Sequence, residues 1–448
     1  MLLLRRLVCA LAALLVSSAA ALAQSPEQEL KKRSAALREK VTEMTELTFN
    51  RDVGVGVYSK DDMRKFLVEE LKLGMSERTA RKFEMIGHRF GFWKKDFKLI
   101  DAYVALLTDS VAGFYHPRTK ELKLIRDGGG DNPNEKLMEQ MLGVKMADVY
   151  LLHELFHAAQ DQHFTLMEYK GHDYKNDDLS LAIEALIEGE ATLVHTRYML
   201  GARYDLLKRQ FMAIPADPPK QETPPVLFKT LYFPYSLGYK FIDEVVKKRE
   251  WKVASKMFED PPLSTEQVLH PEKYLAAERD YPQDLSMNFS RLNKAMGADW
   301  RRLDDNVQGE FTIRLIFEEF KLGRQGVSAA SGWDGDRYTV YHRPKDDAVT
   351  SIWASTWDSE DEAKEFADAY LELLKKKYEG FAEEGKRGGA TVYKTKSDGK
   401  VLLERRGADV LFIEGAPDDD ALKVADPVWE TLKKTELKKF ERKRLRYC

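Results

Sequence analysis

The sequence predicts an α+β protein: a mainly helical domain with a small edge-strand sheet, followed by a small α+β domain. Three observations lead to this prediction. Apolar residues surround His153 and His157 in a stretch typical of a buried helix. Residues 111–125, which precede that helix, alternate as in a β-hairpin. After about Trp300 the pattern changes to short strands around one long helix.

The N-terminal part is predicted to consist mainly of helices. A polar helix from Pro26 to about Met44 has few apolar residues, so we expect it to be solvated and loosely packed. A second helix is predicted from Asp61, its N-cap, to Leu73, where Gly74 ends it. The later elements are a hairpin with its turn at 116–120, a glycine loop at 128–131, the helix around 149–161, a helix at 179–200, a stiff proline-rich connection at 214–225 and an aromatic helical stretch at 231–241.

The C-terminal part is predicted to be a small sheet with helices on one face. Ser359 is the expected N-cap of its long helix, because three acidic residues follow it in the first turn. The predicted elements are strands at 334–341, 349–357, 391–393, 401–403 and 410–413, helices at 359–378 and 419–432, and a charged tail at 433–446 that is a solvated helix end or a frayed terminus. We expect the domains to cover residues 24–299 and 300–448.

Residues 1–23 are typical of a secretory signal peptide. Arg5 and Arg6 precede an apolar run at 7–20, and Ala21-Leu22-Ala23 is a small-x-small cleavage site. The run is too short for a membrane span. We therefore expect export to the periplasm or the extracellular space. Cleavage would remove Cys9 and leave Cys448 as the one cysteine, so no intramolecular disulfide is expected.

The charge balance argues against nucleic-acid and membrane-surface partners. The chain has 71 Lys and Arg against 74 Asp and Glu, and its formal net charge is −3. Proteins that bind polyanionic surfaces usually carry a basic excess. We therefore expect no nucleic-acid or membrane-surface partner, and the shortness of the apolar runs predicts no membrane span.

The stretch H-E-L-F-H at 153–157 predicts a catalytic metal site. Side chains four residues apart lie on one face of a helix, so His153 and His157 can reach the same metal ion. Glu154 points away from the pair but is close enough to hold a metal-bound water as a general base. The alternative is an ordinary amphipathic helix with solvated His and Glu. Apolar neighbours such as Leu152 and Phe156 leave little room for a solvated face.

A third protein ligand is expected on the helix at 179–200, because a catalytic zinc site uses three protein ligands and an open position. Glu184, Glu188 and His195 fall on one face of this helix by their spacing, whereas Glu190 points elsewhere. Gly189, next to Glu188, would let another backbone or a ligand approach closely.

The pairing of H-E-x-x-H with a downstream E-G-x-A resembles the gluzincin metallopeptidases, which include thermolysin-like and aminopeptidase-like enzymes. The resemblance implies that Glu188 is the third zinc ligand and that an edge strand binds extended peptide. This chain departs from the thermolysin-like pattern E-x-x-x-D, because Thr192 stands four residues after Glu188. Asp161 or Glu184 is then expected to serve as the carboxylate partner of a ligand histidine.

The chain also resembles a set of secreted bacterial proteins of unassigned function. The shared stretches are V-A-G-F-Y-H-P at 111–117, H-E-L-F-H-A-A-Q-D-Q-H-F at 153–164 and S-T-E-Q-V-L-H-P-E-K-Y at 264–274. They support the expected fold and metal site, and they imply no particular substrate.

Peptide hydrolysis also needs a donor for the developing oxyanion, which Tyr or His usually supplies. Tyr235 is the first candidate, because Pro234 suits the start of a helix and would hold it at a rigid end. His270 is the second, because it lies in a shared stretch. The alternative is that Tyr232, Tyr235 and Tyr239 are core aromatic residues of one helix.

Together these features predict a secreted zinc metallopeptidase that acts on peptides or proteins. His153, His157 and Glu188 would bind Zn²⁺, and Glu154 would activate the zinc-bound water. One alternative is a non-catalytic binding or assembly protein that keeps a zinc-stabilised gluzincin fold. Another is a zinc hydrolase of non-peptide amides or esters, which would use the same residues.

Overall fold

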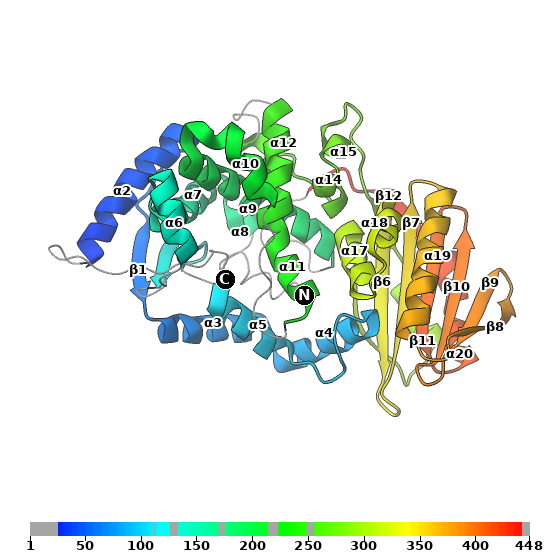
Figure 1. Ribbon diagram of the computed structural model, residues 1–448. Coiled ribbons are helices and arrows are strands. Elements are labelled where there is room, and N and C mark those ends of the chain that lie inside the picture. The colour runs from blue at the N-terminus through cyan, green and yellow to red at the C-terminus, as the bar shows by residue number, and fades with distance from the viewer. Residues whose placement is uncertain are drawn as a thin grey trace.

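The computed structural model describes residues 26–110, 113–125, 133–169, 175–213, 223–248 and 255–440. A largely helical region and a large antiparallel sheet stand side by side (Figure 1). The predicted signal peptide, the glycine loop, both cysteines and most of the proline-rich connection lie outside the described residues. The α+β fold class is confirmed, with a mostly helical N-terminal part and a sheet in the C-terminal part.

Most elements before the large sheet are helices. Their bounds are α2 (Pro26–Thr45), α3 (Lys60–Gly74), α4 (Glu77–Phe90), α5 (Leu99–Ser110), α6 (Pro133–Leu142), α7 (Met146–Phe164), α8 (Leu166–Tyr169), α9 (Asp177–Leu200), α10 (Tyr204–Ala213), α11 (Pro225–Phe233), α12 (Tyr239–Lys248), α14 (Thr265–Leu269), α15 (Pro271–Leu275) and α16 (Phe289–Met296). The short helices η1 (Gly201–Arg203) and η3 (Ser255–Phe258) are 3₁₀ turns, and η2 (Pro234–Gly238) is a π-helix.

The first helices are close to the predicted ones. The N-cap of α3 is Ser59, whose hydroxyl accepts the N–H of Asp62 at 3.1 Å, so the prediction of Asp61 as the cap is wrong by two residues. The helix α2 is less solvated than expected. Its Val41 and Leu37 are buried against Leu155 and Leu152 of α7.

The predicted hairpin is present over residues 113–125, the part of it that the structure describes. Strands β2 (Gly113–His116) and β3 (Glu121–Ile125) pair antiparallel, and β1 (Gly54–Tyr58) pairs parallel with β3 on its other side. The order β1-β3-β2 makes β2 an edge strand, and β2 packs against α7. The sequence did not predict β1, because parallel pairing joins residues more than sixty positions apart.

The C-terminal part is built on a seven-stranded antiparallel sheet of order β5-β6-β7-β11-β10-β9-β8. Its strands are β5 (Arg301–Asn306), β6 (Trp333–Arg343), β7 (Ala348–Trp357), β8 (Ala382–Arg387), β9 (Ala390–Lys394), β10 (Lys400–Arg406) and β11 (Asp409–Ala416). The helices α17 (Gly309–Glu319) and α18 (Gly323–Ala330) precede β6, and α19 (Glu360–Lys377) follows β7. As predicted, Ser359 caps α19, accepting the N–H of Glu362.

Three predictions for this part are wrong. Helices cover both faces of the sheet: α19 packs on Trp353 and Phe412, whereas α16 and the last helices pack on Ile352 and Leu411. The helix predicted at 419–432 is two helices, α20 (Asp419–Leu422) and α21 (Ala425–Thr431), because Pro427 is accommodated only in a first turn. The tail begins as a strand, β12 (Lys433–Glu436), which pairs with β4 (Gln283–Ser286).

One hydrophobic core continues from the helices into the sheet. The ring of Phe90, the last residue of α4, lies 5.0 Å from that of Tyr338 and 5.9 Å from that of Trp353. Figure 1 shows α4 extending from the helical region to the edge of the sheet. Among the described residues, no helix has the length and apolar character needed to span a membrane.

Candidate metal centre

Helices α7 and α9 pack together and bring the three predicted ligands to one point. His153 and His157 lie on one face of α7, and Glu188 lies on the facing side of α9. The Nε2 atom of His157 is 3.1 Å from Nε2 of His153 and 2.9 Å from Oε2 of Glu188, and His153 Nε2 is 3.4 Å from the same oxygen. All three side chains are buried. We call them the triad.

The triad fits a metal ion by both geometry and chemistry. Ligands bonded at about 2.0–2.2 Å in a tetrahedral arrangement are about 3.3–3.5 Å apart. The His153–Glu188 separation of 3.4 Å lies in this range, and the other two, 3.1 and 2.9 Å, are shorter than it by about 0.2–0.4 Å. Two imidazole nitrogens and a carboxylate oxygen that meet in a buried place also need a cation or shared protons between them, because burial of unpaired polar groups is unfavourable. The triad can therefore hold a metal ion.

Each ligand imidazole is oriented through its second nitrogen. His157 Nδ1 lies 2.8 Å from Oε1 of Gln160, and Gln160 in turn donates to Oε2 of Glu190 at 2.8 Å. His153 Nδ1 lies 2.9 Å from Nδ1 of His195 on α9. Burial lowers the pKa of both His153 and His195, which favours the neutral imidazoles that bind metals.

The histidine partners differ from the carboxylates expected from the resemblance. Asp161 accepts a bond from the hydroxyl of Tyr115 at 2.7 Å, pairs with Lys120 at 2.6 Å and caps the N–H of Leu166. Its role is thus to hold the β2–β3 hairpin on α7. The sequence had indicated that His195 shares a face with Glu188, but neither His195 nor Gln160 was assigned a role.

Glu154 is buried beside the triad, and its carboxylate contacts the edge strand. Its Oε2 accepts the backbone N–H of Tyr115 on β2 at 2.6 Å. Tyr115 therefore links β2 to α7 twice, through its N–H to Glu154 and through its hydroxyl to Asp161. Burial and the charge of Asp161 raise the pKa of the Tyr115 hydroxyl, so it stays protonated and continues to donate.

Tyr235 is brought close to the triad by a tight helix crossing. A Cβ atom on Gly189 would lie 2.4 Å from the backbone carbon of Gly238, and one on Gly238 would lie 2.5 Å from the carbonyl oxygen of Ala185. These two glycines let η2 cross α9 backbone to backbone, which confirms the close approach expected at Gly189. The Tyr235 ring then lies 6.1 Å from that of His153, measured between centroids.

The other two tyrosines of that stretch have different surroundings. Tyr239 lies in the core and contacts the hydroxyl of Tyr204 at 3.2 Å. Tyr232 stacks on Phe228 with centroids 5.8 Å apart. The interpretation as core aromatic residues therefore suits Tyr239, while Tyr235 is the member of the set that lies beside His153 of the triad.

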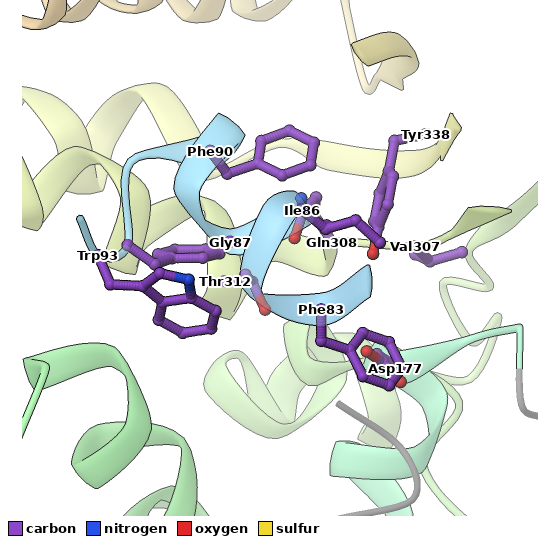
Figure 2. Close-up of a pocket in the computed structure, with 11 residues that line it drawn as sticks. Phe83, Ile86, Gly87, Phe90, Trp93, Asp177, Val307, Gln308, Thr312 and Tyr338 are labelled. Carbon is purple, nitrogen blue, oxygen red and sulfur yellow. The ribbon is translucent and has the colours of Figure 1, made fainter. Parts of the chain in front are cut away.

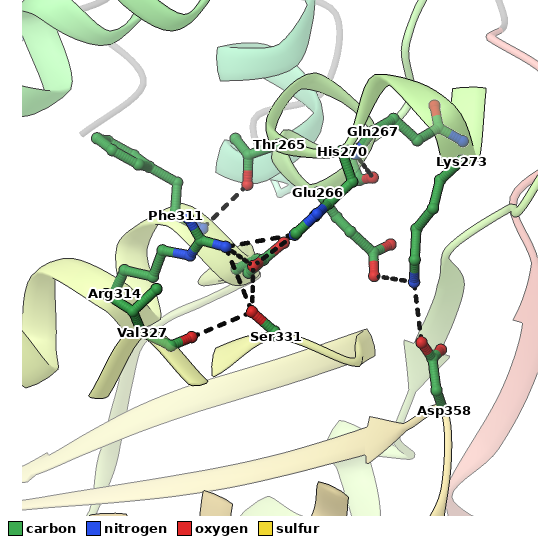
Figure 3. A network of polar contacts seen from close by, with 12 residues as sticks. Thr265, Glu266, Gln267, His270, Lys273, Phe311, Arg314, Val327, Ser331 and Asp358 are labelled. Atoms are coloured by element: carbon green, nitrogen blue, oxygen red, sulfur yellow. Dashed lines mark hydrogen bonds and ion pairs between the residues drawn. The ribbon is translucent and has the colours of Figure 1, made fainter. Parts of the chain in front are cut away.

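His270 belongs to a separate polar network, which Figure 3 shows. Its Nε2 lies 3.0 Å from Oε1 of Glu310 and 3.3 Å from the guanidinium of Arg314. The nearby carboxylates of Glu266, Asp280 and Asp358 form a second acidic group, but the ammonium of Lys273 lies within 2.6–2.8 Å of each. The Lys273 ammonium therefore already takes the central position among these carboxylates.

A pocket between α4 and the start of α17 shares no residue with the triad (Figure 2). Its wall includes the apolar residues Phe83, Ile86, Phe90 and Trp93, and Asp177 and Gln308 are among its few polar residues. Gly87 allows the Trp93 ring to lie directly on α4, because a Cβ atom there would be 2.0 Å from it. The pocket therefore reflects the packing of helices against the sheet.

Comparisons with known proteins cover parts of the chain. A domain of unknown function, DUF8575, matches residues 298–426, which contain the seven-stranded sheet. No curated protein matches the chain. Among solved structures, the chain is similar to a crystal structure described as "a putative hydrolase with a novel fold" from Chloroflexus aurantiacus. That match has 15% identity and a TM-score of 0.31, and it covers 57% of this chain and 91% of the other.

Proposed function

We propose that this protein is an exported zinc metallopeptidase. The observation that carries the proposal is the convergence of His153, His157 and Glu188 at one buried point. Two imidazoles and a carboxylate form the ligand set of a catalytic zinc site. Glu154, adjacent to a ligand but outside the triad, supports a catalytic centre over a structural one, since structural sites need no base beside the metal.

Each residue has a definite task in this proposal. The bound zinc ion supplies Lewis acidity, which makes water more acidic and polarises a peptide carbonyl. The Glu154 carboxylate accepts the proton of the attacking water and delivers it to the leaving amine. The N–H of Tyr115 holds that carboxylate in place through a charge-assisted hydrogen bond.

The oxyanion donor in this proposal is Tyr235. Its ring lies next to His153, and its position is set by the rigid contact between η2 and α9. His270 was the second candidate from the sequence. It is less suitable because its Nε2 already contacts Glu310, a side chain with no exposed surface.

Export is proposed from the leader-like residues 1–23, with peptides or proteins outside the cytoplasm as substrates. The charge balance adds no preference for polyanions. Extended peptides are the expected form of substrate, because the gluzincin resemblance implies peptide binding at an edge strand, and β2 is an edge strand whose Tyr115 contacts Glu154.

The test compares the mature wild-type protein with Glu154→Gln. We expect both proteins to bind one zinc ion, measured by elemental analysis, because Glu154 is not a ligand. The wild type should cleave members of an unbiased peptide library, and the variant should be slower by about 10²–10⁴-fold, the usual contribution of a positioned base. Glu168→Gln on α8 is the matched control and should cleave like the wild type.

Three results would contradict the proposal. Equal cleavage by wild type and Glu154→Gln would assign the activity to another site or to a contaminant. Zinc binding without any peptide cleavage would favour the binding-protein alternative, and cleavage of amide or ester probes alone would favour a non-peptide hydrolase.

A further inference from the structure

The partner of the ligand His153 is unusual for the gluzincin pattern that this chain resembles. That pattern has a carboxylate four residues after the ligand glutamate, and this chain has Thr192 there. The Thr192 hydroxyl is buried and has no hydrogen-bond partner among the described residues. One turn further along the same stripe of α9 is His195, seven residues after Glu188.

We propose that His195 is the positioning residue for ligand His153, in place of the carboxylate that position 192 lacks. The proposal rests on the metal centre proposed above. The two Nδ1 atoms are 2.9 Å apart, and both rings are nearly enclosed, with 4% of His153 and 8% of His195 exposed. The longer imidazole side chain reaches His153 from one turn beyond Thr192.

The hydrogen bond between two identical nitrogens determines where the protons lie. A histidine that binds a metal through Nε2 carries its proton on Nδ1. His153 is therefore the donor, and His195 Nδ1 is the acceptor with its own proton on Nε2. In the other tautomer His195 would present an N–H to an N–H, and the 2.9 Å contact would be lost.

This arrangement gives the centre two neutral supporting groups. His195 supports His153, and Gln160 supports His157. A carboxylate partner would add negative charge and make the ligand imidazole more basic. Because both partners are neutral, Glu188 is the one anionic group among the three ligands and their Nδ1 partners. We therefore expect the metal ion to be more electron-poor and more weakly bound than it would be if a carboxylate contacted His153 Nδ1.

The experiment measures the zinc dissociation constant by competition with a chelator. His195→Leu fills similar space but cannot accept a hydrogen bond, so the dissociation constant should rise by about 10–100-fold. His195→Gln keeps an oxygen acceptor and should stay within a few-fold of the wild type. Thr192→Val is the matched control: it removes a buried hydroxyl from the same stripe of α9 and should leave the constant unchanged.

An equal effect of His195→Leu and Thr192→Val, or no effect of His195→Leu, would overturn the assignment. A second measurement uses only the wild-type protein, so it does not require any variant to fold. Long-range ¹H–¹⁵N spectra of the zinc-loaded wild type should show His195 protonated at Nε2 and bare at Nδ1, and the opposite tautomer would overturn the proposal.

The outcome is separable from that of the peptidase proposal. If the wild type binds zinc, His195→Leu weakens that binding, and no peptide is hydrolysed, the role of His195 is supported and the peptidase proposal is overturned. A wild type that binds no zinc overturns both.

Discussion

At the residue scale, the chemistry of this protein is concentrated in a few polar side chains within an apolar helix pair. His153, His157, Glu154 and Glu188 each have at most 4% of their surface exposed. Burial of such groups is unfavourable unless each has a partner. A metal ion would meet this requirement for three of them, and the Tyr115 N–H does so for Glu154.

The first prediction concerns His157. His157→Ala removes one of three ligands, so we expect zinc content to fall from one ion per chain to near zero. We expect added zinc to raise the melting temperature of the wild type, because a ligand that binds only the native state stabilises it, and we expect no such response in the variant.

His163→Ala is the control for this prediction. His163 is exposed on the same helix, and its Nε2 contacts the carbonyl oxygen of Thr48 at 2.8 Å, away from the triad. It should keep both zinc and the thermal response. Stoichiometric zinc in purified His157→Ala would show that the metal is bound elsewhere.

At the element scale, the crossing of η2 over α9 determines where Tyr235 lies. The contact is between backbones, so neither element can yield by rotating a side chain. Glycine is usually unfavourable inside a helix by about 1 kcal/mol relative to alanine, so its presence at position 189 indicates a steric requirement.

Gly189→Ala tests this crossing. The added methyl would lie 2.4 Å from the Gly238 carbon and 2.5 Å from its oxygen, so η2 must move away from α9. We expect a loss of about 1–3 kcal/mol in the free energy of unfolding, measured in denaturant, as for other overpacked positions.

Gly385→Ala on β8 is the matched control, because nothing lies within 4 Å of a Cβ atom there. It should leave the free energy of unfolding within about 0.5 kcal/mol of the wild type. A neutral or stabilising Gly189→Ala would mean that the helices do not cross this closely in solution.

At the scale of the whole molecule, the helical region and the sheet are joined by apolar packing and by buried charge. Lys377 on α19 pairs with Glu414 of β11 at 2.8 Å and donates to the carbonyl oxygen of Arg89, the penultimate residue of α4. The Arg89 guanidinium donates to the Tyr378 hydroxyl at 2.9 Å. Separating the two regions would therefore break the two hydrogen bonds that join Arg89 of α4 to Lys377 and Tyr378.

Asp334 on β6 gives the stability of the protein a predictable pH dependence. Burial, with the nearby carboxylates of Asp358 and Asp280, raises the pKa of Asp334 to about 6 from 3.8. The unfolded chain therefore loses this proton first as the pH rises, and the native state is progressively disfavoured between about pH 4 and pH 6.

We expect Asp334→Asn to stabilise the protein at pH 7 and to have little effect at pH 4. A full shift of two pKa units corresponds to about 3 kcal/mol, and screening at this partly exposed site reduces it to about 1 kcal/mol. Asp346→Asn is the control, and its effect on stability at pH 7 should have the opposite sign. A hydrogen bond from Arg343 lowers the pKa of Asp346, so removing this carboxylate should destabilise the protein. Denaturant unfolding at both pH values is the measurement, and an Asp334→Asn gain that is equal at pH 4 and pH 7 would contradict the assignment.

The sequence by itself determined the features that depend on local periodicity and capping. The α7 and α9 helices, the β2–β3 hairpin, the Ser359 cap and the shared helix face of His153 and His157 all follow from spacing within one or two elements, whereas the choice of Glu188 came from the gluzincin resemblance. These features extend over a few turns or a short turn loop, so neighbouring residues are sufficient to specify them.

Only the tertiary structure decided the features that join distant segments. The parallel strand β1, the pairing of β12 with β4, the covering of both sheet faces, and the use of His195 in place of Asp161 beside the ligands all depend on contacts between residues far apart in the chain. A helical pattern shows which residues share a face, but the partner of that face is set by packing, which depends on every element at once.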